Sequence, residues 1–240
     1  MVPHDSEDGV RSRSHRAVLA VRSQIQPGSL PLLLVASLLL YALNGLAVDS
    51  TTGATLVRLG RLGAACAGLY VLSGSRVTLW LGGVVAGVIF SLEVGLWHID
   101  PQVDRIVQDS LTTGLFLWVL TVVLRAIFEP ATTERDAVIG ALCGYLIILM
   151  VFLRVHGLIE ALSPGSYHAD GPPLSDRSDM TLLAVFQYFS TITVTTVGFG
   201  DIVPVTPAAR LATGLEAIMG QLYLAVVIAI LVGRVGSRRG

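Results

Sequence analysis

Six stretches of apolar residues, each about as long as a helix that crosses a lipid bilayer, dominate this sequence. They are residues 30–48, 54–72, 77–97, 110–128, 137–159 and 211–232. A spanning helix needs about 20 mostly apolar residues, and lipid offers no hydrogen bonds to unpaired backbone groups, so such stretches fold as helices. Only 14% of the 240 residues are charged, against about 25% in a typical soluble domain. The sequence predicts an all-α membrane protein with six transmembrane helices.

A seventh apolar stretch, residues 180–194, is too short to cross a bilayer and lies between the fifth and sixth predicted spans. Glycine-rich sequence follows it at once, which is typical of a re-entrant segment that enters and leaves the membrane on one face. The preceding residues 165–179 are rich in Pro, Gly, Ser and Asp, so we expect an exposed outer loop there. Ser178 or Asp179 is suited to cap the short helix.

The distribution of arginine predicts the orientation of the chain. All 16 basic residues are arginines, and cytoplasmic loops carry an excess of positive charge. If residues 1–29 form a cytoplasmic tail, ten of the 16 arginines fall on the inner side, and six spans return the C-terminus to the cytoplasm. We expect a multi-pass protein of the cell (plasma) membrane, surrounded by the lipid bilayer. The net charge of −1 gives no argument for nucleic acid as a partner.

Residues 190–201, Ser-Thr-Ile-Thr-Val-Thr-Thr-Val-Gly-Phe-Gly-Asp, carry the most informative chemistry. A cation that has lost its water shell needs oxygen atoms around it, and backbone carbonyl groups supply them only if successive carbonyls point the same way. Alternating left- and right-handed backbone conformations achieve this, and Gly198 and Gly200 adopt positive φ at low cost. The Thr196 hydroxyl adds another oxygen. One strand gives one oxygen per layer, so four chains around an axis are needed to surround the ion.

The run Thr195-Thr196-Val197-Gly198-Phe199-Gly200-Asp201 resembles the signature of the potassium channel family. Residues 137–235 also follow the order of that family: outer helix, pore helix, filter, Pro204 and inner helix. The resemblance implies a K⁺-selective channel that assembles as a homotetramer, in which K⁺ is the permeant ligand and no cofactor is used. It divides the chain into a tail (1–29), a four-helix domain (30–130) and a pore domain (137–235). Within the pore domain it places the pore helix at 180–194, the selectivity filter at 196–200 and the inner helix at 211–232.

The resemblance also implies roles for single residues. The K⁺ ions would be held at Thr196, Val197, Gly198 and Phe199, and Gly200 would complete the filter. Thr195, Asp201 and Tyr188 would support the filter, with Asp201 at the outer mouth and Tyr188 in an aromatic layer around it. Gly220 falls where these channels often carry a hinge in the inner helix, although close helix packing explains a glycine equally well.

Two features bear on gating. A voltage sensor needs several arginines at three-residue spacing in one span, and the fourth span, 110–128, carries only Arg125 near its inner end. We therefore expect little voltage-dependent opening. Glu216 lies within an otherwise apolar span, where a carboxylate is costly and often functional. We expect it either to form a buried pair with Arg154, at comparable depth, or to act as a proton-sensitive gate. His98, His156 and His168 lie near the predicted outer face, and we expect no functional role for them.

Two other classes of protein fit the sequence less well. A subunit of a K⁺ transporter is the nearest alternative, but such proteins usually contain four pore-loop repeats in one chain, and this sequence has one. An intramembrane enzyme would need a nucleophile with its base, paired carboxylates or a metal cluster, and no HExxH, GxSxG or zinc spacing occurs. The sequence therefore indicates a channel and not an enzyme.

Overall fold

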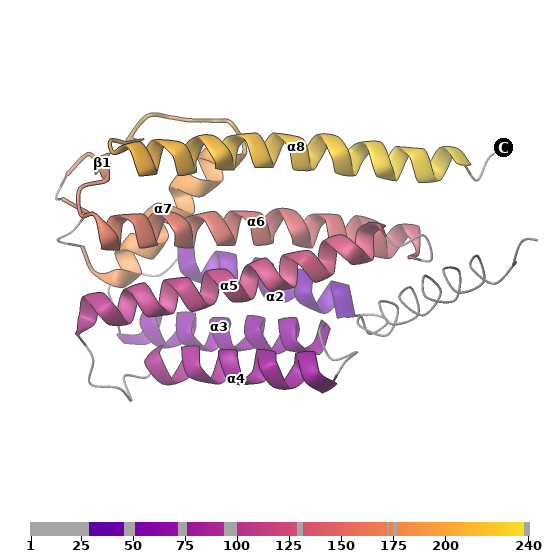
Figure 1. Ribbon diagram of the computed structural model, residues 1–240, viewed down its shortest axis with the longest axis horizontal. Coiled ribbons are helices and arrows are strands. Elements are labelled where there is room, and N and C mark those ends of the chain that lie inside the picture. Colours follow the sequence, from indigo (N-terminus) through magenta and orange to yellow (C-terminus); the bar gives the residue numbers. More distant parts are fainter. Residues whose placement is uncertain are drawn as a thin grey trace, which may run out of the picture.

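The computed structural model describes residues 29–45, 51–71, 76–93, 100–128, 132–171, 173–174 and 177–237, so the predicted tail lies almost entirely outside the described residues. Helices account for most of them. They are α2 (Ser29–Gly45), α3 (Thr51–Val71), α4 (Arg76–Glu93), α5 (Pro101–Phe128), α6 (Glu134–Leu162), α7 (Asp179–Val194) and α8 (Pro207–Ser237). Six of these helices run roughly alongside one another, whereas α7 crosses obliquely between α6 and α8 (Figure 1).

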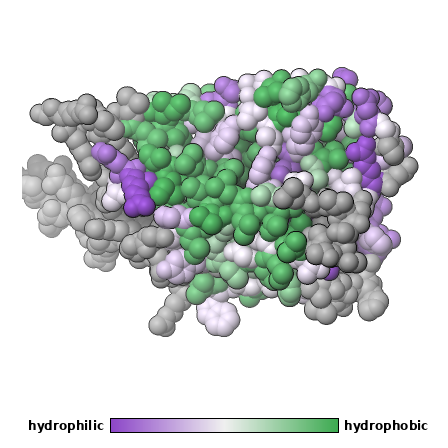
Figure 2. All heavy atoms as spheres, turned by 180° about the vertical axis from the view of Figure 1, so that it is seen from behind, coloured by the Kyte–Doolittle hydropathy of each residue, from purple (hydrophilic) through white to green (hydrophobic). Residues whose placement is uncertain are grey.

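Three of the described helices are long and apolar enough to cross a membrane, namely α5, α6 and the segment Pro207–Leu231 of α8. The apolar segments of α2, α4 and α7 are shorter, and α3 carries Arg58 and Arg61 within its 21 residues. Apolar side chains gather over the middle of the face drawn in Figure 2, with hydrophilic ones toward its ends. The structure supports a helical membrane protein, and the count of six spans stays a prediction.

Helix α5 begins nine residues earlier than the span that the sequence predicted. Asp100 acts as its cap, since its side chain accepts hydrogen bonds from the backbone N–H groups of Gln102 and Val103. Pro101 occupies the first helical position, where its missing N–H costs nothing. The polar sequence after Pro101, interpreted as outer loop on hydropathy alone, is therefore the first part of the helix.

Helix α6 forms the centre of the core. Fully buried side chains such as Cys143, Ile147 and Met150 line it, and it contacts α2, α5, α7 and α8. At its C-terminal end, the buried carboxylate of Glu160 accepts hydrogen bonds from the backbone N–H groups of Gly165 and Tyr167. This carboxylate fixes the direction in which the chain leaves the helix.

A small antiparallel sheet connects the loop after α6 with the segment after the glycine-rich run. Strand β1 (Tyr167–Ala169) pairs with β2 (Ile202–Pro204), with His168 opposite Val203. The Val205 N–H adds a further hydrogen bond to the carbonyl oxygen of Ser166, at 2.8 Å. The sheet thus holds the end of the glycine-rich segment close to the C-terminal end of α6.

The first described helix contacts the short oblique helix directly. The Tyr41 hydroxyl lies 3.1 Å from the Thr191 Oγ1, and the Gln187 amide donates to the Tyr41 carbonyl oxygen at 2.9 Å. Helix α5 packs along α6 of the same chain, with only residues 129–133 between them (Figure 1). Helices α2 and α5 therefore pack against the C-terminal helices of their own chain.

Candidate ion-conducting site

The short helix α7 carries the glycine-rich segment at its C-terminal end. Ser178 caps its N-terminus by accepting a hydrogen bond from the Thr181 N–H, as the sequence predicted. At the other end, the Ile192 carbonyl oxygen accepts hydrogen bonds from the N–H groups of Val197 and Gly198, at 2.8 and 3.1 Å. These bonds turn the chain sharply out of the helix and fix where the following segment starts.

The backbone then alternates in handedness. Thr196, Gly198 and Gly200 have φ of 61°, 53° and 81°, whereas Val197 and Phe199, between them, do not have positive φ. The two glycines were expected to adopt this conformation. Thr196 was not, because positive φ is a rare and strained state for a β-branched residue, and strain of this kind costs about 1–3 kcal/mol. Strained residues of this kind gather at functional sites, where the surrounding structure enforces them.

The side chains of this segment are exposed although two of them are large and apolar. Val197 is 52% exposed and Phe199 is 71% exposed. Helix α8, which follows, likewise exposes apolar side chains such as Leu215, Ile218 and Leu222. Because α8 includes a candidate membrane span, exposed apolar side chains of this kind fit contact with lipid or with another protein chain.

The expected supporting residues lie around this segment. Thr195 forms the C-cap of α7, and its hydroxyl donates to the Thr191 carbonyl oxygen at 2.6 Å. The Tyr188 hydroxyl donates to the Asp201 carboxylate at 2.8 Å. This bond joins α7 to the far end of the glycine-rich segment, so the segment is connected to the helix at both of its ends.

Gly220 lies against the C-terminal end of α7. A β-carbon at this position would lie 2.6 Å from the Val194 Cγ2 and 2.8 Å from the Val194 carbonyl oxygen. Helix α8 runs without interruption from Pro207 to Ser237, through Gly220. The structure therefore supports the packing explanation for this glycine, and its role as a hinge remains a prediction.

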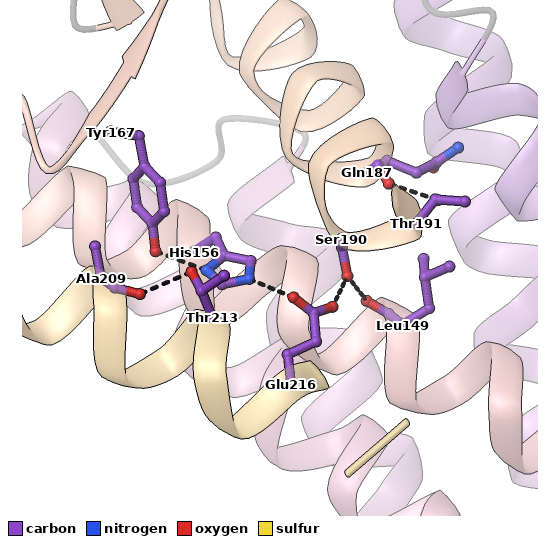
Figure 3. Close-up of polar contacts among 9 residues, drawn as sticks. All are labelled: Leu149, His156, Tyr167, Gln187, Ser190, Thr191, Ala209, Thr213 and Glu216. Carbon is purple, nitrogen blue, oxygen red and sulfur yellow. Dashed lines mark hydrogen bonds and ion pairs between the residues drawn. The ribbon is translucent and has the colours of Figure 1, made fainter. Parts of the chain in front are cut away.

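Behind the segment, Glu216 is completely buried in a cluster of polar side chains (Figure 3). One carboxyl oxygen lies 2.8 Å from the His156 Nε2, and the other contacts the Ser190 hydroxyl. The His156 Nδ1 in turn lies 2.6 Å from the Tyr167 hydroxyl. The cluster joins the outer helix α6, the oblique helix α7, strand β1 and the inner helix α8.

The predicted pair of Arg154 with Glu216 is wrong. Arg154 donates instead to the Asp109 carboxylate of α5 at 2.8 Å, in a buried ion pair. Depth in the membrane alone suggested Arg154 as the partner. His156 lies at nearly the same depth, but two residues correspond to about 200° around a helix, so the two side chains occupy different faces of α6.

Three residues at the site were missed from the sequence, namely His156, Ser190 and Tyr167. A signal existed: Glu216 required a hydrogen-bonding partner within the bundle, and His156 and Ser190 are polar residues in apolar helices near the same depth. The helical face on which each lies could not be read from one sequence.

The comparisons with known proteins agree with this geometry. Residues 140–236 match a family model described as ion channel. The chain is similar to the potassium voltage-gated channel protein shk-1 of Caenorhabditis elegans, with 35% identity over 85 residues, which are 35% of this chain and 15% of that protein. Together these findings support an ion channel. The Protein LctB of Bacillus caldotenax is 28% identical over 148 residues, 61% of this chain and 88% of that protein.

No solved structure gives a significant match. The part that matches the ion-channel family begins within α6 and ends within α8, so it contains the oblique helix and the glycine-rich segment. It contains none of the first four described helices, α2 to α5. The match points to a channel and not to an enzyme.

Proposed function

We propose that this chain is a subunit of a K⁺-selective channel, in which four copies place residues 196–200 around one axis as the selectivity filter. The observation that carries the proposal is the alternation of positive φ at Thr196, Gly198 and Gly200. This alternation suits carbonyl groups that point to one side of the strand and replace the water shell of the ion.

The surroundings of the segment support the same function. Helix α7 ends at Val194, immediately before the filter, so the negative end of its dipole lies near the inner entrance. The exposed apolar side chains of Val197, Phe199 and α8 fit burial against three further copies. The printed name of the nematode relative, a potassium channel, agrees with K⁺ as the permeant ion.

Reversal potentials test the proposal most directly. The full chain is purified, reconstituted in lipid bilayers and recorded under a K⁺ gradient opposed by a Na⁺ gradient. We expect the current to reverse close to the K⁺ equilibrium potential. A reversal midway between the K⁺ and Na⁺ values would contradict K⁺ selectivity, and uptake that requires a coupled ion gradient would favour the transporter alternative.

The variant Gly198→Ala provides the control for the filter. Within one chain, nothing lies within 4 Å of an added β-carbon, so the substitution creates no clash inside the copy that carries it. Only the positive φ is disfavoured, by roughly 1–2 kcal/mol. We expect a chain that still assembles but loses K⁺ current. An unchanged K⁺ current in Gly198→Ala would contradict the assignment of the filter.

A further inference from the structure

The polar cluster behind the filter consists of His156, Tyr167, Ser190 and Glu216, and its chemistry is more specific than that of a simple ion pair. The side chains of His156, Ser190 and Glu216 are 0% exposed. The His156 ring packs edge-on against Phe189, with centroids 5.0 Å apart, and against Tyr167. Aromatic rings thus surround the cluster and exclude water from it.

The position of the Ser190 hydroxyl indicates where one proton resides. Its oxygen lies 3.2 Å from the Leu149 carbonyl oxygen and also contacts the Glu216 carboxyl group. A hydroxyl group has a single proton and can donate it to one acceptor only. If the Glu216 carboxyl oxygen that contacts Ser190 carries a proton, this proton is donated to the Ser190 oxygen. The Ser190 hydroxyl is then free to donate its own proton to the Leu149 carbonyl oxygen.

The other side of the cluster is consistent with a neutral histidine. Within the described part of the chain, the Tyr167 hydroxyl has His156 as its hydrogen-bond partner. Burial is the main reason that the pKa of Tyr167, in strand β1, is raised, so the phenol keeps its proton. That proton is donated to the His156 Nδ1, and the Nε2–H then donates to Glu216. A doubly protonated ring would leave the Tyr167 proton without an acceptor.

The resulting chain of hydrogen bonds runs in one direction, from Tyr167 through His156, Glu216 and Ser190 to the Leu149 carbonyl oxygen (Figure 3). Each proton has one acceptor, and no group carries a charge. This matters because a charged pair taken out of water loses hydration energy that the attraction between its charges often fails to offset.

The neighbouring charged groups are engaged elsewhere. On α6, Glu160 accepts hydrogen bonds from two backbone N–H groups, and Arg154 pairs with Asp109. Among the described residues of the packed elements, the titratable groups near Glu216 are His156 and Tyr145 of α6 and Tyr167 of β1; α7 contributes the Ser190 hydroxyl. No arginine in the described part of the chain forms an ion pair with Glu216.

We propose that Glu216 is a positioning residue that stays protonated at working pH and connects the inner helix α8 to the filter through Ser190. The inference rests on the proposed channel function. Ser190 lies on α7, whose last carbonyl groups fix the start of the filter, and Gly220 contacts the end of the same helix one turn further along α8. A displacement of α8 therefore reaches the filter through two adjacent contacts.

Single-channel recording of four variants tests the connection. Glu216→Gln keeps both hydrogen bonds, since its amide N–H donates to Ser190 and its oxygen accepts from His156, so we expect conducting bursts within about twofold of wild type. Glu216→Ala and Ser190→Ala each remove a buried partner, and we expect bursts roughly tenfold shorter. Thr213→Val is the matched control, because within the described residues the Thr213 hydroxyl donates to the Ala209 carbonyl oxygen of its own helix; we expect no change.

The protonation state has a readout that needs no current. A protonated carboxyl group gives a C=O band in the infrared spectrum that a carboxylate lacks. We expect this band in wild type at neutral pH, its absence in Glu216→Gln, and a shift of its frequency in Ser190→Ala. If wild type and Glu216→Gln give the same spectrum, or if Glu216→Gln shortens bursts as much as Glu216→Ala, the neutral carboxyl group is refuted.

These outcomes separate the two proposals. A wild-type protein that fails to conduct K⁺ would overturn the proposed function, while the infrared band would still report on Glu216. Normal bursts in both Glu216→Ala and Ser190→Ala, with K⁺ current present, would overturn the connection alone. If Glu216→Ala fails to assemble, Ser190→Ala and the wild-type spectrum still decide the question.

Discussion

Single residues determine how closely α8 approaches the C-terminal end of α7. Gly220 lets the backbone of α8 lie against Val194, the last residue of α7. A second contact of the same kind occurs further along, where Gly144 of α6 makes room for the Tyr223 ring, whose hydroxyl donates to the Ala141 carbonyl oxygen at 2.7 Å. The outer and inner helices therefore interlock through small residues, as is common in membrane proteins.

We predict that Gly220→Ala destabilises the protein by about 1–3 kcal/mol, because the added carbon meets backbone that cannot yield without moving α7. The measurement is the thermal unfolding of the detergent-solubilised protein. Gly214→Ala is the matched control: it lies on the same helix with nothing within 4 Å, and we expect it to be neutral or slightly stabilising. Equal stability of the two variants would argue against close packing at Gly220.

Tyr167 gives a prediction about alkaline pH. Its pKa is raised mainly by burial, so the folded state holds the phenol proton more tightly than the unfolded state does. Stability from this group is complete below about pH 10, the ordinary value for tyrosine, and falls as the pH rises above it. We expect Tyr167→Phe to show a shallower loss of stability between pH 10 and 11 than wild type. A slope equal to that of wild type would contradict this contribution.

At the scale of helices, sequence reasoning located the elements well and their partners poorly. The apolar stretch 180–194 and the glycine-rich sequence after it predicted correctly that α7 ends at Val194, because such sequence stops a helix. Sequence reasoning missed the first turns of α5, since a cap at Asp100 can extend a helix into polar sequence that hydropathy assigns to a loop. Pairings such as Arg154 with Asp109 depend on helix rotation, which one sequence does not reveal.

The same holds for the candidate site. The positive φ of Gly198 and Gly200 was predictable, because glycine adopts this conformation at low cost. The positive φ of Thr196 was not, since no propensity favours it. The partners of Glu216 come from three separate elements, so only their arrangement in space could identify them.

The ion pair between α5 and α6 yields a prediction at this scale. Arg154→Met leaves the buried Asp109 carboxylate without its partner, and we expect a loss of roughly 3–5 kcal/mol in unfolding free energy. The double variant Asp109→Leu with Arg154→Met removes both charges and should recover most of that loss. Denaturant unfolding in mixed micelles measures both. A double variant less stable than Arg154→Met would contradict the argument.

At the scale of the whole molecule, the charges on α5 bear on gating. The helix carries Arg105 and Arg125 twenty residues apart, with the acids Asp104 and Asp109 between or beside them. Asp109 is held in its ion pair with α6. The regular row of arginines that moves through the field of a voltage sensor is absent from this helix.

We therefore predict a shallow conductance–voltage relation in symmetric K⁺. The fraction of open channels should change only slightly over the range of membrane potential in which a channel with three to four sensing charges per subunit would open fully. Neutralising Arg125 by substitution with Gln should leave the relation unchanged. A steep relation in wild type that becomes shallow in Arg125→Gln would assign a sensing role to this residue.

The contact of α2 with α7 has a consequence for how such a protein is built. Tyr41 contacts Thr191 and Gln187 within one chain, so this contact between α2 and α7 needs no second copy. In the proposed tetramer, assembly would then consist of docking folded copies rather than of exchanging helices between them. In an assembly that mixes variant and wild-type copies, a substitution at this contact would disturb only the copy that carries it, except where the copies meet at the shared axis.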